Sequence, residues 1–142
     1  MRRAVLAVLS LLAASGIAVA APPPGQAGAA WAEDWSAKQL EPTLALFATD
    51  AVFVQPDGAR VEGLPAIRTL FQTVLAANDP SIVLHSLAAG SAGTAGFEAG
   101  RYDETIRPAA GGPPVSYHGH YFLRLRREAD GNWRIIELAW TE

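Results

Sequence analysis

The stretch Leu46–Gly63, LFATDAVFVQPDGARVEG, joins a short apolar run to a tight turn and a second short run. The apolar run predicts a strand that ends at one polar residue, Gln55. The Pro-Asp-Gly that follows favours a turn, because proline presets φ, aspartate bonds local backbone and glycine permits a positive φ. We therefore expect a small hairpin. Gln55 stands at the end of its first strand, where either a catalytic or a purely structural side chain could lie.

Helical periodicity flanks this hairpin on both sides. Before it, Trp31 and Trp35 share one helix face, and a second short helix is expected from about Glu41. After it, GLPAIRTLFQTVLAAN carries apolar residues at helical spacing. The period then changes to two, which predicts four longer strands over residues 81–89, 94–105, 115–126 and 132–141. Three helices, a hairpin and a run of antiparallel strands make an α+β domain.

Alternation separates the two faces of the later strands. In YHGHYFLRLR, one face carries the tyrosines and leucines, and the other carries His118, His120, Phe122 and two arginines. In the last strand, three apolar side chains are expected to share a face. They are Ile136, Leu138 and Trp140. The sheet is expected to bury one face against the helices.

The first twenty residues have the pattern of a secretory signal peptide. Arg2 and Arg3 precede an apolar stretch, and Ala18-Val19-Ala20 is a small-x-small cleavage site before a proline run. A retained membrane anchor is the competing interpretation, because a span needs about 20 apolar residues. We expect cleavage after Ala20 and a periplasmic or secreted protein. The expected organisation is a signal peptide over 1–20, a flexible linker over 21–28 and one domain over 29–142.

Composition excludes several classes of partner. The chain has no cysteine, so it has no disulfides even in an oxidising compartment. Without the two signal-peptide arginines, the chain has nine basic and fourteen acidic residues. Nine minus fourteen gives a net charge of minus five. Nucleic acid and anionic membranes select basic faces, so neither is an expected partner after signal removal. No Ser-His-Asp order, phosphate loop or nucleotide fingerprint is present, and no cofactor is expected.

Three segments of the chain resemble the nuclear transport factor 2-like superfamily, which includes the ketosteroid isomerases and the SnoaL-like polyketide cyclases. They are W…WSAKQLEPTLALFATDAVFVQPDGARVEGLPAIRTLF, FEAGRYDET and YFLRLRREADGNWRIIELAW. Among its branches, the chain looks most similar to the uncharacterised one numbered 4440 among domains of unknown function. The resemblance implies a cone-shaped roll, with a bent antiparallel sheet around three helices and a pocket at the open end. It also implies a homodimer through the outer sheet face, but a shared fold assigns no activity.

The resemblance places Gln55 where ketosteroid isomerases carry their general-base aspartate. An amide cannot accept a proton near neutral pH. Ketosteroid isomerases also have two oxyanion-hole donors. The position that matches the first donor holds Trp31, and the position that matches the second falls near Tyr121. Steroid isomerisation by that mechanism is therefore not expected. Gln55 is either a hydrogen-bonding residue of the pocket or a strand-end amide paired with backbone.

The resemblance also implies that the strand face that carries Glu98 points toward the pocket. An inward carboxyl among aromatic rings could act as an acid or base, with Tyr121 as a hydrogen-bond donor. The alternative is a structural glutamate paired with an arginine or with solvent. Five residues are expected to contact a ligand, although core packing is the ordinary role of such rings. They are Trp31, Phe53, Gln55, Tyr102 and Trp140.

His118 and His120 point to the same side of their strand, with Cβ atoms about 6.5–7 Å apart. Such a pair can serve zinc if a neighbouring strand supplies a third ligand. Arg124 and Arg126 share that face and would oppose a cation, so no metal site is expected. A polar patch at the dimer interface is the preferred interpretation. His85 shows no partner in the sequence and is expected to be structural.

Three functions remain in competition at this point. The first is an exported, homodimeric protein that binds a small, mostly apolar organic molecule in its pocket without steroid-isomerase catalysis. The second is an enzyme of isomerase, cyclase or lyase type that uses Glu98 as acid or base and Tyr121 or Tyr102 as donor. The third is a protein-interaction module that acts through its sheet face. The ligand itself has no signature in the sequence.

Overall fold

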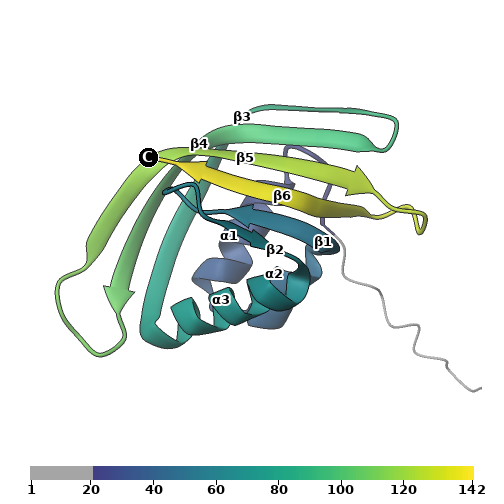
Figure 1. Cartoon of the computed structure of the whole chain (residues 1–142). Coiled ribbons are helices and arrows are strands. Elements are labelled where there is room, and N and C mark those ends of the chain that lie inside the picture. Colours follow the sequence, from purple (N-terminus) through teal and green to yellow (C-terminus); the bar gives the residue numbers. More distant parts are fainter. Residues whose placement is uncertain (1–20) are drawn as a thin grey trace, which may run out of the picture.

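The structure, a computed structural model, describes residues 21–142 (Figure 1). The helices are α1 (Ala27–Ser36), α2 (Leu40–Ala45) and α3 (Leu64–Ala77). The strands are β1 (Phe47–Val54), β2 (Arg60–Glu62), β3 (Asn78–Ala92), β4 (Ala95–Pro108), β5 (Val115–Arg127) and β6 (Trp133–Thr141). The predicted elements occur in the predicted order, and the α+β cone fold is confirmed. The predicted signal peptide lies outside the described residues.

The six strands form one bent, unclosed sheet in the order β2-β1-β6-β5-β4-β3, and the helices pack on its concave side (Figure 1). The hairpin β1–β2 and the meander β3–β6 are antiparallel. The pair β1–β6 is parallel, which the expected antiparallel sheet did not include. This pair joins the N-terminal hairpin to the last strand, so the hairpin and the meander belong to one sheet.

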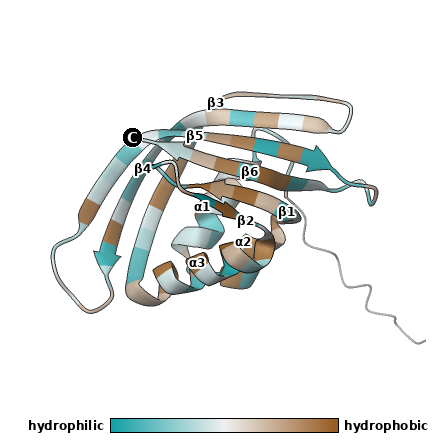
Figure 2. Cartoon of the chain, in the orientation of Figure 1, coloured by the Kyte–Doolittle hydropathy of each residue, from teal (hydrophilic) through white to brown (hydrophobic). Residues whose placement is uncertain are grey.

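The core fills the space between the helices and the concave face. Its centre is a set of aromatic rings in edge-to-face and stacked contact. Phe71 of α3 lies 4.9 Å from Trp35 and 5.2 Å from Phe53, between ring centroids. Figure 2 shows apolar and polar residues alternating along the strands, as expected for a sheet with one buried face. Within residues 21–142, no helix is long and apolar enough to span a bilayer.

The predicted faces of β5 are confirmed. Tyr121, Leu123 and Leu125 are buried, whereas His118, His120, Phe122 and Arg124 are exposed. The prediction for β6 was wrong at Ile136, which is only half-buried, while Ile135 is fully buried. A β-bulge is the reason: Arg124 pairs with Glu137 and Leu125 with Ile135, so Ile136 is the extra residue. Strict alternation cannot reveal such an insertion.

Residues 21–28 make more contacts than a flexible linker would. The backbone N–H of Ala21 donates to the carbonyl oxygen of Trp133 at 3.1 Å, and Ala21 is buried. Helix α1 already begins at Ala27, inside the expected linker. A Cβ added at Gly28 would overlap the carboxylate of Glu98, so only glycine lets the backbone approach there. This segment is therefore packed as part of the domain.

Candidate functional site

A cavity of about 110 Å³ lies between α1 and the concave face of the sheet. Five aromatic side chains, one proline, one isoleucine and one glutamate line it. They are Trp31 and Trp35 from α1, Phe53 from β1, Pro56 from the following turn, Ile82 from β3, Tyr102 and Glu104 from β4, and Trp140 from β6. Residues from the two ends of the chain thus meet around one space.

The aromatic walls support one another. Trp31 and Trp35, one helical turn apart, stack with ring centroids 5.3 Å apart and an interplanar angle of 17°. Trp140 lies 5.3 Å from Trp31 and 5.0 Å from Tyr102, between ring centroids. Aromatic pairs at these separations stabilise one another beyond their buried area. The walls are therefore held in place before any ligand binds.

Glu104 is the one ionisable acid among the residues that line the cavity. The indole Nε1–H of Trp35 donates to its Oε1 at 3.4 Å. Burial raises the pKa of Glu104, and the hydrogen bond from Trp35 lowers it by less. None of the ion pairs formed by residues 21–142 includes Glu104. This carboxyl therefore lies in an aromatic environment without a cationic partner in the described chain.

Two further polar groups belong to the cavity wall. Burial raises the pKa of Tyr102, and the carboxylates of Glu142 and Glu104 raise it further, so its hydroxyl keeps its proton. The indole Nε1 of Trp31 is buried and has no hydrogen-bond partner among the described residues. Buried N–H groups are rarely left unpaired in proteins. The wall thus combines one carboxyl with an available hydroxyl and an unpaired indole N–H.

The structure places Glu98 elsewhere, at the first turn of α1. Its carboxylate accepts the backbone N–H of Gly25 at 2.8 Å, that of Gly28 at 3.2 Å and the hydroxyl of Tyr121 at 2.7 Å. Burial is the largest cause that raises the pKa of Tyr121, and the hydrogen bond to Glu98 is the second. Neither Glu98 nor Tyr121 lines the cavity. Their predicted catalytic role stays a prediction, and three donors on one carboxylate favour a structural role.

Of the five expected ligand contacts, Trp31, Phe53, Tyr102 and Trp140 line the cavity and Gln55 does not. Gln55 is held by its backbone in the β1–β2 turn. Its N–H donates to the carbonyl oxygen of Ala59 at 2.8 Å, and its own carbonyl oxygen accepts the N–H of Gly58 at 2.8 Å. Whether the four lining residues contact a ligand stays a prediction.

Sequence reasoning missed Glu104, although a signal was present. The resemblance turns the strand face of Glu98 inward, and Gly100, Tyr102 and Glu104 follow Glu98 at the same parity. The structure confirms the inward direction of this series, since Glu98, Gly100 and Tyr102 are buried. Extending the alternation by one step would have found the carboxyl of the cavity.

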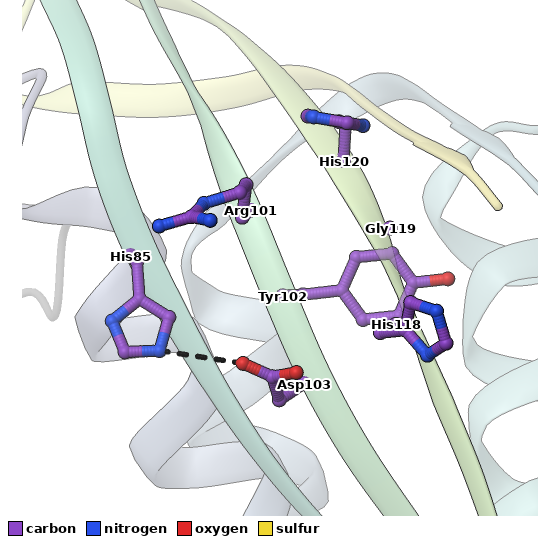
Figure 3. A pocket seen from close by; sticks show the side chains of 7 residues that line it. All are labelled: His85, Arg101, Tyr102, Asp103, His118, Gly119 and His120. Atoms are coloured by element: carbon purple, nitrogen blue, oxygen red, sulfur yellow. Dashed lines mark ion pairs between the residues drawn. The ribbon is translucent and has the colours of Figure 1, made fainter.

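A second hollow, of about 280 Å³, lies on the outer face of β3, β4 and β5 (Figure 3). His85, Arg101, His118 and His120 contribute their side chains to it. His85, expected to be without a partner, lies 3.6 Å from Asp103, between Nε2 and Oδ2. Among residues 21–142, no group of three or more His, Cys, Asp or Glu side chains is arranged to hold a metal ion.

The same outer face exposes several large apolar side chains. Leu87 and Val83 of β3 are 63% and 53% exposed, and Phe97 and Phe122 are also exposed. Phe97 and Phe122 line a shallow apolar hollow at the far end of the sheet. Exposed apolar groups gathered on one face are typical of an interaction surface.

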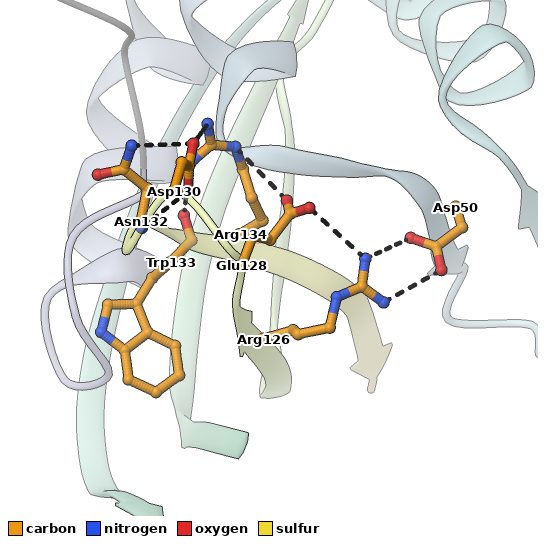
Figure 4. A network of polar contacts seen from close by, with 7 residues as sticks. All are labelled: Asp50, Arg126, Glu128, Asp130, Asn132, Trp133 and Arg134. Atoms are coloured by element: carbon orange, nitrogen blue, oxygen red, sulfur yellow. Dashed lines mark hydrogen bonds and ion pairs between the residues drawn. The ribbon is translucent and has the colours of Figure 1, made fainter. Parts of the chain in front are cut away.

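The network around the β5–β6 hairpin is a structural cluster (Figure 4). Arg126 of β5 donates to both carboxylate oxygens of Asp50, at 3.1 and 2.8 Å. Arg134 of β6 lies 3.4 Å from Asp130 and 3.8 Å from Glu128, between nitrogen and oxygen. These contacts tie β1 to the hairpin across the sheet. The Asp50 pair is solvent-exposed, so it stabilises the fold only weakly.

The chain matches the SnoaL-like domain family over residues 29–137. A ketosteroid isomerase-like protein from Erwinia carotovora atroseptica has a similar structure, with a TM-score of 0.73 and 14% identity over 80% of this chain and 88% of that one. A nuclear transport factor 2-like protein from Salmonella enterica serovar Typhimurium has a TM-score of 0.71 and 15% identity over 80% and 83%. A candidate scytalone dehydratase from Novosphingobium aromaticivorans has a TM-score of 0.68 and 17% identity over 79% and 77%. No curated protein matches the chain. Identities this low show a shared fold alone.

Proposed function

The chain belongs to the SnoaL-like domain family, and from that premise we propose that it binds a small organic molecule in the aromatic cavity. The observation that carries this proposal is a cavity walled by five rings with a single carboxyl, Glu104. Ligand sites are mostly apolar and contain a few polar groups that set orientation. The volume of about 110 Å³ lies below the usual 300–1,000 Å³, so the ligand is small or inserts only one end.

Tryptophan fluorescence tests this proposal directly, because Trp31, Trp35 and Trp140 line the cavity. The variant Ile82→Phe fills the cavity from β3 and is expected to weaken binding at least about tenfold, since the added ring occupies ligand volume. The matched control is Val83→Phe, the next residue on β3, whose side chain is exposed on the opposite face. Small molecules that co-purify with the protein, identified by mass spectrometry, supply the first ligands to titrate. Equal binding by both variants would exclude the cavity.

An acid–base enzyme is the second candidate, and Glu104 is its carboxyl. A half-buried carboxyl whose pKa is raised by burial, beside the hydroxyl of Tyr102, is a candidate acid or base. We expect any turnover of small ketones or enones to fall by about a hundred- to ten-thousand-fold in Glu104→Gln. Glu98→Gln, tested at a temperature where it stays folded, separates the two carboxyls. Activity that depends on Glu98 and survives Glu104→Gln would support the assignment made from the sequence.

Ketosteroid isomerisation is expected to stay near the buffer background in the native protein. The position of the general base holds Gln55, whose amide accepts no proton. Gln55→Asp is expected to give only a weak gain, because the oxyanion donors of that mechanism are also changed. Rate against pH for both proteins on a model ketosteroid measures this. Robust native isomerisation would contradict the proposal.

A homodimer through the outer sheet face is part of the proposal. The exposed apolar residues there, among them Leu87, Phe97 and Phe122, support it. Light scattering at tens of micromolar is expected to give twice the mass of the mature chain, and Phe122→Lys is expected to shift it toward the monomer. A native monomer whose outer face binds another protein would instead support the interaction module.

Export to the periplasm or medium is proposed from the N-terminal sequence. The Arg-Arg pair, the apolar stretch and Ala18-Val19-Ala20 support it. N-terminal sequencing of the secreted fraction is expected to begin at Ala21 or within a few residues. Soluble cytosolic protein that retains Met1 would contradict the proposal.

A further inference from the structure

Glu104 has an unusual surrounding for a glutamate. From α1 it faces Trp35, and across the sheet its register partners are Ile82 on β3 and Tyr117 on β5. Tyr102 lines the cavity beside it, and the carboxylates of Glu104 and Glu142 both act on the hydroxyl of Tyr102. The nearest histidine in the register, His118, pairs with Asp103 on the opposite face of the strands. No cationic side chain of the described chain faces Glu104 inside the cavity.

A half-buried carboxylate without a cationic partner is costly, because its charge loses part of its hydration. Two arrangements remove that cost. The carboxyl keeps its proton, or a cation enters the site and balances the negative charge. The protein supplies no such cation among the lining residues, so a cation would have to come with the ligand.

The remaining walls favour the same kind of ligand. The cavity is lined by three tryptophans, one tyrosine and one phenylalanine. The faces of such rings carry partial negative charge and attract ammonium groups, tryptophan most strongly. A ring-lined cavity with one carboxyl and no lining Lys, Arg or His among the described residues combines both sources of attraction for a cation.

We propose that the cavity binds the head group of an alkylammonium compound, with the ammonium among the rings and its charge balanced by the carboxylate of Glu104. This inference rests on the proposed ligand-binding function and names the ligand class. The volume of about 110 Å³ suits a small head group rather than a whole large molecule. The tail of the ligand leaves past Pro56, the exposed lining residue.

The proposal fixes the sign of a pH dependence. The ammonium binds the ionised carboxyl, so its binding displaces the proton of Glu104. Affinity for a permanent cation therefore rises as pH increases through the pKa of Glu104 and levels off above it. A neutral carbonyl ligand that accepts a hydrogen bond from the protonated acid would show the opposite trend.

Choline and 3,3-dimethylbutan-1-ol are matched probes, because they have nearly the same shape and differ in charge. Tryptophan fluorescence and calorimetry from pH 4.5 to 8 measure both affinities. We expect choline to bind about tenfold more tightly than the neutral alcohol at pH 7.5, and its affinity to rise with pH. Glu104→Gln is expected to reduce the preference to the part that the rings supply and to abolish the pH dependence. Glu33→Gln, which removes the same charge from an exposed position of α1, is expected to keep both.

The possible outcomes separate the inference from the proposed function on which it rests. Equal affinities for the two probes, or choline affinity that falls with rising pH, overturn the alkylammonium class while ligand binding in the cavity stands. Choline binding that persists unchanged in Ile82→Phe also overturns the inference, because the cation then binds outside the cavity. Failure of both probes overturns it too, and the co-purified molecules then decide the ligand-binding function independently.

Discussion

Glu98 and Glu104 lie on the same face of β4, and the difference between them is instructive. Glu98 is 1% exposed and accepts hydrogen bonds from two backbone N–H groups and one tyrosine hydroxyl. Glu104 is half-buried, and within residues 21–142 its carboxyl has one hydrogen bond, from an indole N–H at 3.4 Å. The first carboxyl is enclosed by donors, and the second lies at the wall of a cavity.

Burial alone therefore does not identify a functional carboxyl in this chain. The segment 21–28 supplies two of the donors to Glu98, so that group is satisfied by the fold itself. Glu104 lacks comparable donors, and its remaining hydrogen-bonding capacity is available to a ligand. The more deeply buried carboxyl is better explained by stability, and the less satisfied one by binding or catalysis.

Removing the Glu98 carboxylate tests the structural half of this comparison and has the largest expected effect. Glu98→Ala leaves two backbone N–H groups and the hydroxyl of Tyr121 unpaired inside the protein, and is expected to lower the free energy of unfolding by about 3–5 kcal/mol. Urea unfolding followed by circular dichroism measures it. Glu98→Gln keeps an acceptor and should cost less. A loss in Glu98→Ala no greater than that in Glu104→Ala would remove the distinction.

The next effect concerns the close approach of α1 to Glu98. A Cβ at Gly28 would overlap the Glu98 carboxylate and press on the Tyr121 hydroxyl, so Gly28→Ala is expected to cost about 1–3 kcal/mol of unfolding free energy. Ala29→Ser, at the next and exposed position, is the control and should stay within about 0.5 kcal/mol. If the cost comes from this clash, the double variant with Glu98→Ala is less destabilised than the sum of the two changes.

Glu104 is expected to have a smaller and pH-dependent effect on stability. Its pKa in the folded state is raised by burial above the ordinary value of 4.5. The folded protein therefore holds this proton to higher pH than the unfolded chain does. The stability contribution is complete below about pH 4.5 and is lost as pH rises through the folded-state pKa.

Glu104→Gln removes this titration, so the variant gains stability relative to the native protein as pH rises from about 4.5 through the folded-state pKa of Glu104. Thermal unfolding at several pH values measures the difference. A gap that stays constant with pH, or that closes as pH rises, would contradict the raised pKa.

The smallest expected effect is at an exposed carboxylate that has a partner. Asp50 accepts two hydrogen bonds from Arg126, yet it remains in contact with water. Asp50→Asn is expected to lower the free energy of unfolding by less than about 1 kcal/mol, and salt should reduce the difference further. A larger and salt-independent loss would show that the number of partners matters more than burial.

Much of the fold followed from short-range patterns. Helical spacing predicted α1 and α3, and period-two alternation predicted the four long strands within a few residues of their bounds. The aromatic part of the cavity was also accessible, since Trp31, Phe53, Tyr102 and Trp140 were named from their positions and the family resemblance. Gln55 does not line the cavity, its backbone is bonded within the hairpin turn, and its role toward a ligand stays a prediction.

The choice between the two carboxyls needed the tertiary structure. The sequence by itself determined the elements and their faces, because spacing along a helix or strand decides which side chains point the same way. It could not determine which distant groups meet each face. Gly25 reaches Glu98 across 73 positions, and Trp35 reaches Glu104 across 69. The parallel β1–β6 pair and the bulge at Ile136 also arise from long-range pairing. Only the folded chain, in which such partners are brought together, decided which carboxyl is satisfied and which one faces the cavity.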